Sequence, residues 1–345
     1  MNNKTEQQNL INTIKGTTNS FKQKSVYDKY KQKSTVSLRM NEIENDMVGY
    51  RKLMKEQTEA SNNIKKKTLL IPIGFIGVFL SMFFQLSFLS TIFIILIFVG
   101  FISSGKAMVK NYKDIKAQDD AMKDIYYNKV IPEVLSVMDV NVKISKDAFS
   151  SGNKLISKSL VQQGNTTNTY VTFENEDENN YFRVSNAHIE NVTTDSDGDT
   201  QRQKLFDGQV FQFKTNWNIE GTIRIIPKAH IFGIKRRKNS IKDFSKIEVM
   251  DDEINKKIAI YSNNTDAGHY IHHKLLETAY ELQKEYTDFA ICIEKNDVYL
   301  AVNTNYKLFD IPNTKNKVDC ITAENIATEI EAVIAYATEM KNRIL

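Results

Sequence analysis

Hydrophobic and polar positions along the chain separate one long apolar stretch, Thr68 to Gly105, from a largely polar remainder. The stretch contains no Asp, Glu, Lys, Arg or His. A single helix through it would be about 57 Å long, whereas the hydrocarbon core of a bilayer is about 30 Å thick. The polar break Gln85-Leu86-Ser87 therefore predicts two spans, Thr68–Phe84 and Phe88–Ser104, joined by a tight turn. The alternative is a buried hairpin within a soluble protein, but the polar remainder offers little apolar shell to cover it.

Apolar residues also recur at helical spacing on both sides of this stretch. On its N-terminal side they alternate at steps of four and three, as positions a and d of a heptad do. The residues of this stripe are Val36, Met40, Ile43, Met47, Tyr50 and Met54. Residues 106–138 carry a second, less regular apolar stripe. The two patterns predict helical extensions that pack antiparallel as a short stalk, or that pair between two chains as a coiled coil.

Beyond about residue 140 the pattern changes to short segments, several with alternating apolar and polar residues, separated by turn residues. Helical spacing returns only at Thr265–Tyr286 and at Ala323–Ile344. Two apolar runs joined around Lys295-Asn296-Asp297 predict a β-hairpin, Phe289–Ile293 with Val298–Val302. The other predicted strands are Tyr170–Phe173, Tyr181–Val192, Gln209–Phe213, Thr222–Ile226, Glu248–Met250 and Lys257–Tyr261.

Strands and helices that intersperse without strict alternation favour an α+β class with a mixed, largely antiparallel sheet. The predicted fold is thus a two-span transmembrane helical hairpin with cytoplasmic helical extensions, followed by this α+β domain. The domains expected are a polar basic arm (1–34), an amphipathic heptad-like helix (35–67), the hairpin (68–105), a helical stalk (106–139) and the α+β domain (140–345).

Charge is distributed unevenly along the chain. The formal net charge is +4, but residues 1–67 hold 14 Lys and Arg against 7 Asp and Glu, so they carry +7 and the remainder carries −3. Attraction to an anionic inner leaflet explains this excess, and nucleic acid is an unlikely partner. Basic residues flank the apolar stretch on both sides, which predicts cytoplasmic termini and a two-span protein of the bacterial cell membrane. The basic residues expected to contact an anionic surface are Lys65, Lys66, Lys67, Lys235, Arg236, Arg237 and Lys238.

The sequence offers little catalytic chemistry. His269 and His273 would lie one turn apart on a helix, as metal ligands can, but no third ligand is evident, so a helix surface carrying histidines is favoured. Cys292 and Cys320 lie in no metal or redox spacing, and Cys292 sits in an apolar run typical of an inert thiol. Phosphate-binding, dinucleotide-binding and serine-elbow motifs are absent from the sequence. We therefore expect no catalytic residues and no cofactor.

Three C-terminal segments resemble a known family: Phe211–Pro227, Ile247–Ser262 and Phe289–Phe309. They are similar to the uncharacterised bacterial membrane proteins catalogued as domain of unknown function 3137. The resemblance covers residues 205–345 in detail and the hairpin only in plan. It implies an N-terminal helical segment, two close membrane spans and an α+β domain, and it implies no reaction or cofactor. This chain departs from the family at Ile254 and Ile258, where Phe is usual, and at His269, where Arg is usual.

These observations predict a non-enzymatic scaffold or binding module that presents its α+β domain to a protein partner, expected to be a membrane or envelope protein. The lipid bilayer is a second partner, and the heptad stripe offers a contact for a homo-oligomer. One alternative is a membrane-tethered enzyme or small-molecule sensor that uses His269 or His273. Another is a binder of anionic lipid or nucleic acid.

Overall fold

The computed structural model describes residues 30, 37–68, 113–114, 116–145, 156, 158, 164–195, 197–228, 243–286, 288–304, 306–311, 318 and 321–345. The chain divides into two compact units. The sheet unit comprises Met1–Gln32, Asn141–Leu308 and Glu329–Leu345. The helical unit comprises Lys33–Val140 and Phe309–Thr328.

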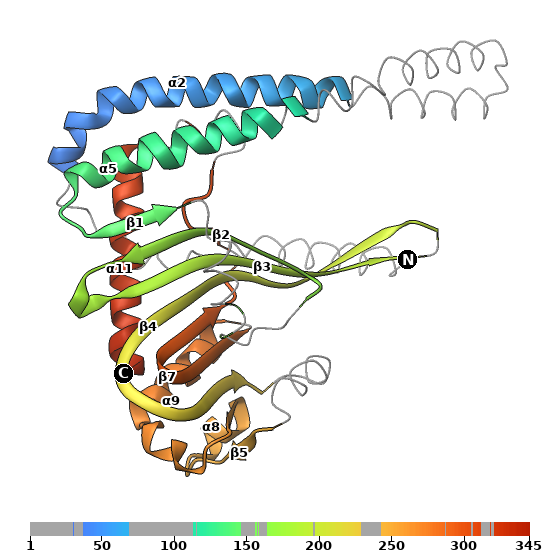
Figure 1. Cartoon of the computed structure of the whole chain (residues 1–345), viewed down its shortest axis with the longest axis vertical. Helices are drawn as coiled ribbons and strands as arrows, with labels where there is room; N and C mark the ends of the chain where they lie inside the picture. Colours follow the sequence, from blue (N-terminus) through green and yellow to red (C-terminus); the bar gives the residue numbers. More distant parts are fainter. Residues whose placement is uncertain are drawn as a thin grey trace, which may run out of the picture. The chain divides into compact units, whose positions relative to one another are not determined.

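The sheet unit is built on a seven-stranded sheet in which every strand pair of the described residues is antiparallel (Figure 1). The order is β1-β2-β3-β4-β6-β5, and β7 pairs with β4. The strands are β1 (Val142–Ser145), β2 (Thr166–Asn175), β3 (Phe182–Thr194), β4 (Thr200–Pro227), β5 (Ser245–Ile247), β6 (Ile258–Ser262) and β7 (Phe289–Val302). The helical elements of this unit are η3 (Glu178–Asn180), α8 (Asp252–Lys257), η4 (Thr265–Tyr270), α9 (His273–Glu285) and the larger part of α11 (Ala323–Ile344).

Strand β4 bends around β7, as the yellow and orange ribbons of Figure 1 show. Its first half pairs with the second half of β7, Gln209 opposite Val302, and its second half pairs with the first half of β7, Ile225 opposite Ile291. Strand β7 doubles back at Lys295, where φ is 54°, and Asn303 N donates to Asp288 O at 3.0 Å. The hairpin predicted within residues 289–302 is therefore confirmed, and it fills the bend of β4.

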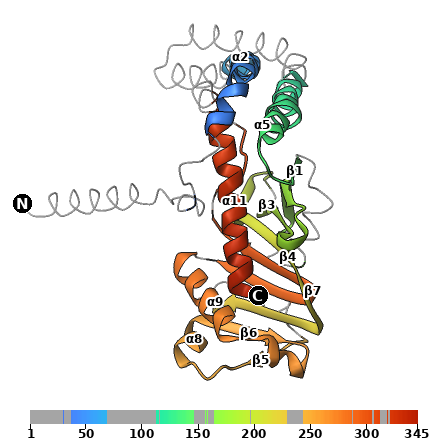
Figure 2. The same cartoon turned by 90° about the vertical axis from the view of Figure 1, so that its left-hand side faces the viewer.

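The two faces of the sheet carry different side chains. One face holds large buried rings, and Phe211 of β4 packs against Tyr336 of α11 with ring centroids 5.4 Å apart. Figure 2 shows α11 running alongside this face. The opposite face holds a core cluster in which smaller side chains such as Ala187, Val210 and Ala301 lie with Ile156 and with the rings of Phe206 and Tyr299. The predicted stripe of the last helix is confirmed, because its six apolar residues are buried: Ile326, Ile330, Val333, Ala337, Met340 and Ile344.

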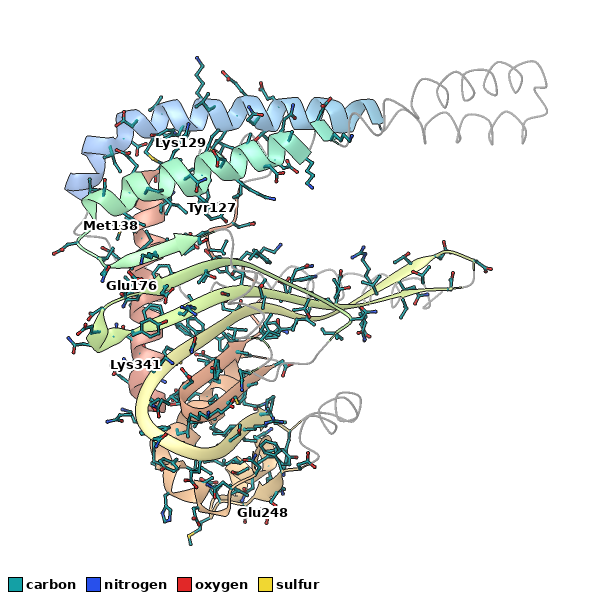
Figure 3. The ribbon with its side chains drawn as sticks, viewed as in Figure 1. Tyr127, Lys129, Met138, Glu176, Glu248 and Lys341 are labelled. Carbon is teal, nitrogen blue, oxygen red and sulfur yellow. The ribbon has the colours of Figure 1, made fainter. Side chains whose placement is uncertain are left out.

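The helical unit pairs α2 (Ser37–Thr68) with the helical segment that includes η2 (Tyr126–Val130) and α5 (Ile131–Val137). Tyr127, labelled in Figure 3, donates from its hydroxyl to Phe309 O at 3.0 Å. The Thr58 hydroxyl lies 3.3 Å from the sulfur of Met122, which links the two helical segments.

The heptad stripe packs within the chain, so the prediction of a coiled coil is wrong. Ile43, Met47 and Met54 are buried and Tyr50 is half-buried. The physical reason is that η2 and α5 of the same chain lie against α2 and exclude water from the stripe. Val36 and the side chain of Met40 lie outside the described residues.

The membrane part of the predicted fold also needs correction. Within the described residues, no helix is long and apolar enough to cross a membrane. These residues form a largely antiparallel sheet with few helices, in place of a two-span hairpin. The long helices α2 and α11 carry charged side chains along part of their surface, so each buries only an apolar stripe. Residues 69–105 of the predicted hairpin lie outside the described residues, and the predicted location at a bacterial membrane stays a prediction.

Candidate functional site: an aromatic corner

The structure separates the two histidines that the sequence placed on one helix. His269 lies in η4, and His273 is the first residue of α9. The predicted helix Thr265–Tyr286 is interrupted because Ile271 (φ −94°, ψ 80°) and His272 (φ −88°, ψ 161°) are not helical. Both candidate ligands are exposed, and His273 Nε2 lies 2.9 Å from Glu277 Oε1. In the part of the chain that the structure describes, no group of three His, Cys, Asp or Glu could hold a metal ion.

His272, between these two, has a structural role that its sequence position does not reveal. Its Nδ1 accepts a hydrogen bond from Leu275 N at 3.1 Å, so it caps the N-terminus of α9. Its Nε2 lies 3.1 Å from Ile344 O, and a carbonyl can only accept, so Nε2 carries the ring proton. One neutral imidazole therefore ties the start of α9 to the end of α11. Sequence reasoning misses this cap because Ser, Thr, Asp and Asn are the usual residues there.

Trp217 is the chain's one tryptophan, and it lies on the bend of β4 beside His272. Its ring centroid is 5.9 Å from that of Tyr270 and 6.3 Å from that of His272, the latter in an edge-to-face arrangement. All three side chains are half-buried. We name Trp217, Tyr270 and His272 the aromatic corner; it joins β4, η4 and the cap of α9.

The backbone around Trp217 is held on both sides. Trp217 N donates to the Thr215 hydroxyl at 3.0 Å, and Asn218 adopts a left-handed conformation with φ 49°. Gly221 has φ 87°, and a Cβ there would lie 2.6 Å from Asn263 Oδ1, so this close approach requires glycine. The Asn263 side chain also accepts from Thr222 N at 2.7 Å. The corner is therefore presented by a fixed bend of the sheet rather than by a free loop.

A second cluster lies where the paired strands β3 and β4 extend as a two-stranded ribbon beyond the end of β2. Strand register places His188 opposite Asp207, with His188 Nδ1 3.4 Å from Asp207 Oδ1 and His188 Nε2 3.7 Å from Glu190 Oε2. Arg202 bonds Glu190, and Lys204 Nζ lies 3.8 Å from Asp207 Oδ2. These charges compensate one another at the base of the ribbon. The sequence could not reveal the cluster, because it depends on the pairing of β3 with β4.

The other residues that the sequence singled out are the two basic runs and Cys292. The basic run Lys235, Arg236, Arg237 and Lys238 lies outside the described residues, and Lys65, Lys66 and Lys67 are described only as backbone of α2. Their contact with an anionic surface stays a prediction. The Cys292 side chain is buried, and burial raises the pKa of its thiol to about 12, which agrees with the inert thiol expected there.

Replacing His272 by Ala should lower the free energy of unfolding by about 1 to 2 kcal/mol, because the helix loses its cap and Ile344 O loses a donor. Replacing it by Asn, which can cap a helix but is too short to keep both contacts, should restore part of this loss. Urea unfolding of each variant measures the effect. His273→Ala is the matched control, since that side chain is exposed; equal losses in His272→Ala and His273→Ala would contradict the capping role.

Comparison with known proteins agrees with the resemblance seen in the sequence. Residues 204–342 match the family described as protein of unknown function (DUF3137). The match begins in β4, ends in α11 and contains the whole aromatic corner. No curated protein and no solved structure matches the chain.

Proposed function

We propose that this chain is a non-enzymatic binding module and that a protein partner docks on the aromatic corner. The observation that carries the proposal is Trp217, a half-buried tryptophan held on a fixed bend beside Tyr270 and His272. Tryptophan and tyrosine are over-represented among the residues that dominate binding energy at protein interfaces. The net charge of +7 over residues 1–67 supports a membrane or envelope protein as the class of partner.

The fixed backbone favours binding for an energetic reason. Ordering side chains and loops on association costs free energy, and a surface that is already rigid avoids that cost. Trp217 is held by the Thr215 hydroxyl and by the neighbouring Asn218 and Gly221 conformations. An incoming apolar side chain could therefore pack on the exposed part of the indole without reorganising β4.

Charged residues of both signs lie on α9 and α11, the two helices that His272 ties together. Arg343 pairs with Glu281 and with Glu339, and Lys274 Nζ donates to Asn342 O. His273 pairs with Glu277. Protein interfaces usually combine an apolar or aromatic centre with charged and polar residues farther out. Because His269 and His273 lie in separate elements, no observation on the described residues favours the alternative of an enzyme or sensor built on them.

The test is in-cell cross-linking followed by affinity purification of the full chain, compared with Trp217→Ala. We expect capture of the specific partner to fall at least about tenfold, since an aromatic centre of an interface is worth about 2 kcal/mol or more. Trp217→Phe should retain part of the capture. Tyr280→Ala is the matched control, because Tyr280 is a half-buried aromatic residue of α9 that contacts Lys284 instead of the corner.

Two results would contradict the proposal. One is unchanged capture by Trp217→Ala when circular dichroism shows that the variant is folded. The other is an equal loss in Tyr280→Ala, which would indicate a general loss of stability. Since Trp217 is the chain's one tryptophan, its fluorescence reports directly on burial of the indole once a partner is purified.

A further inference from the structure

Arg224 lies on the sheet face opposite α11, away from the large aromatic core. Its neighbours Ile223 and Ile225 are buried on the other face, because successive residues of a strand point to opposite sides. In the strand register Arg224 stands between Cys292 of β7 and Tyr261 of β6. It therefore lies on the sheet face that carries the core cluster of Ala187, Val210 and Ala301.

The guanidinium of Arg224 has buried N–H donors that find no acceptor among the described residues. Its Nε and Nη1 atoms are buried and make no hydrogen bond among the described residues. The other arginines with described side chains each pair with a carboxylate: Arg51 with Glu44, Arg183 with Glu174, Arg202 with Glu190, and Arg343 with Glu281 and Glu339. Arg224 is thus the exception within the described part of the chain.

The surroundings of Arg224 stabilise its charge only in part. The Phe244 ring lies over the guanidinium, with its centroid 3.9 Å from Cζ, and supplies a cation–π contact. Glu294 is the acidic group that acts on it, but that carboxylate bonds Lys158 Nζ at 2.6 Å. Burial accordingly lowers the pKa of Arg224. Burying a cation whose N–H donors make no hydrogen bond costs free energy, unless an anion accepts those hydrogen bonds.

We propose that Arg224 binds an oxyanion of a small soluble molecule, a phosphate or a carboxylate, on this face of the sheet. The planar guanidinium suits either group, since both present oxygen acceptors at the spacing of its N–H donors. Phe244 lies over the guanidinium and forms one wall of the site. The site is separate from the aromatic corner and does not depend on the function proposed there.

The test measures thermal unfolding of the full chain in sodium phosphate and in sodium succinate, each against sodium chloride at equal ionic strength. We expect at least one of the two anions to raise the Tm of the wild type by several degrees, because a ligand that binds only the folded state stabilises it. A response to phosphate alone assigns a phosphate ligand, and a response to succinate alone assigns a carboxylate. Arg224→Met should abolish the shift.

Arg183→Met is the matched control: Arg183 pairs with Glu174, so this variant should keep the anion response. Arg224→Lys covers the case in which Arg224→Met does not fold, because lysine keeps the charge but loses the planar donors and should reduce the shift. No response of the wild type to either anion would overturn the proposal. So would an equal response in wild type and in whichever Arg224 variant folds.

Discussion

Gly208→Ala is expected to destabilise the sheet unit by about 3 kcal/mol or more. A Cβ at this position would lie 2.0 Å from Val302 O and 2.8 Å from Thr304 N, both of them backbone atoms. Neither atom can easily withdraw. Asp207 N bonds the Asn303 side chain at 3.3 Å, and the Thr304 hydroxyl bonds Gln209 Oε1 at 2.7 Å, so the end of β7 is fixed to β4 on both sides of the glycine.

Urea unfolding followed by circular dichroism measures this loss. Gly268→Ala serves as the control, because a Cβ there meets no atom within 4 Å and the residue belongs to the same unit. It should change stability by no more than about 0.5 kcal/mol. If Gly208→Ala unfolded at the same urea concentration as Gly268→Ala, the close approach of β4 to the end of β7 would be disproved.

Asn186→Leu should cost about 3 to 5 kcal/mol, because it leaves several buried polar groups without partners. The Asn186 side chain is 1% exposed. Its Nδ2 donates to Leu308 O at 2.9 Å, and its Oδ1 accepts from Leu308 N at 2.9 Å and from Gln209 Nε2 at 3.2 Å. Leucine fills a similar volume but satisfies none of these groups. Leu308 would then lose its attachment to β3.

A double-mutant cycle with Gln209→Leu tests whether these contacts form one network. Gln209 also bonds Thr304 and the Tyr306 carbonyl, so the two single losses should overlap and the double variant should lose less than their sum. Additivity within about 0.5 kcal/mol would show that the two amides act independently. Asn168→Leu, at an exposed position of β2, is the control for the substitution itself.

Elements set by local pattern are the ones that the sequence predicts well. The last helix has the predicted bounds, Ala323–Ile344, because an unbroken stripe at helical spacing leaves one solution. The β7 hairpin follows from two apolar runs around a short polar turn. The bend of β4 could not be foreseen, because Lys214 to Thr222 resembles an ordinary loop until β7 fills the space between its two arms.

Patterns that fit more than one arrangement left alternatives open or led to wrong predictions. The Met47 and Met54 stripe suits a second chain and suits η2 and α5 equally well, and spacing alone cannot distinguish the two. Length and hydropathy alone predicted the membrane hairpin. For the candidate site, the spacing of His269 and His273 assumed one helix, whereas the cap at His272 divides it. Trp217 and Tyr270 meet only through the pairing of β4 with β6, which no local pattern encodes.

Because β7 fills the bend of β4, the centre of the sheet can form only after β7 has been synthesised. Until Val302 has left the ribosome, the inner backbone groups of both arms of β4 have no strand to pair with. The sheet therefore cannot form its centre from the N-terminal end onward, and it closes late through contacts between distant parts of the sequence, which makes folding slow. During that interval the edges of both arms of β4 that pair with β7 stay unpaired, and such edges are where nascent chains aggregate or recruit chaperones.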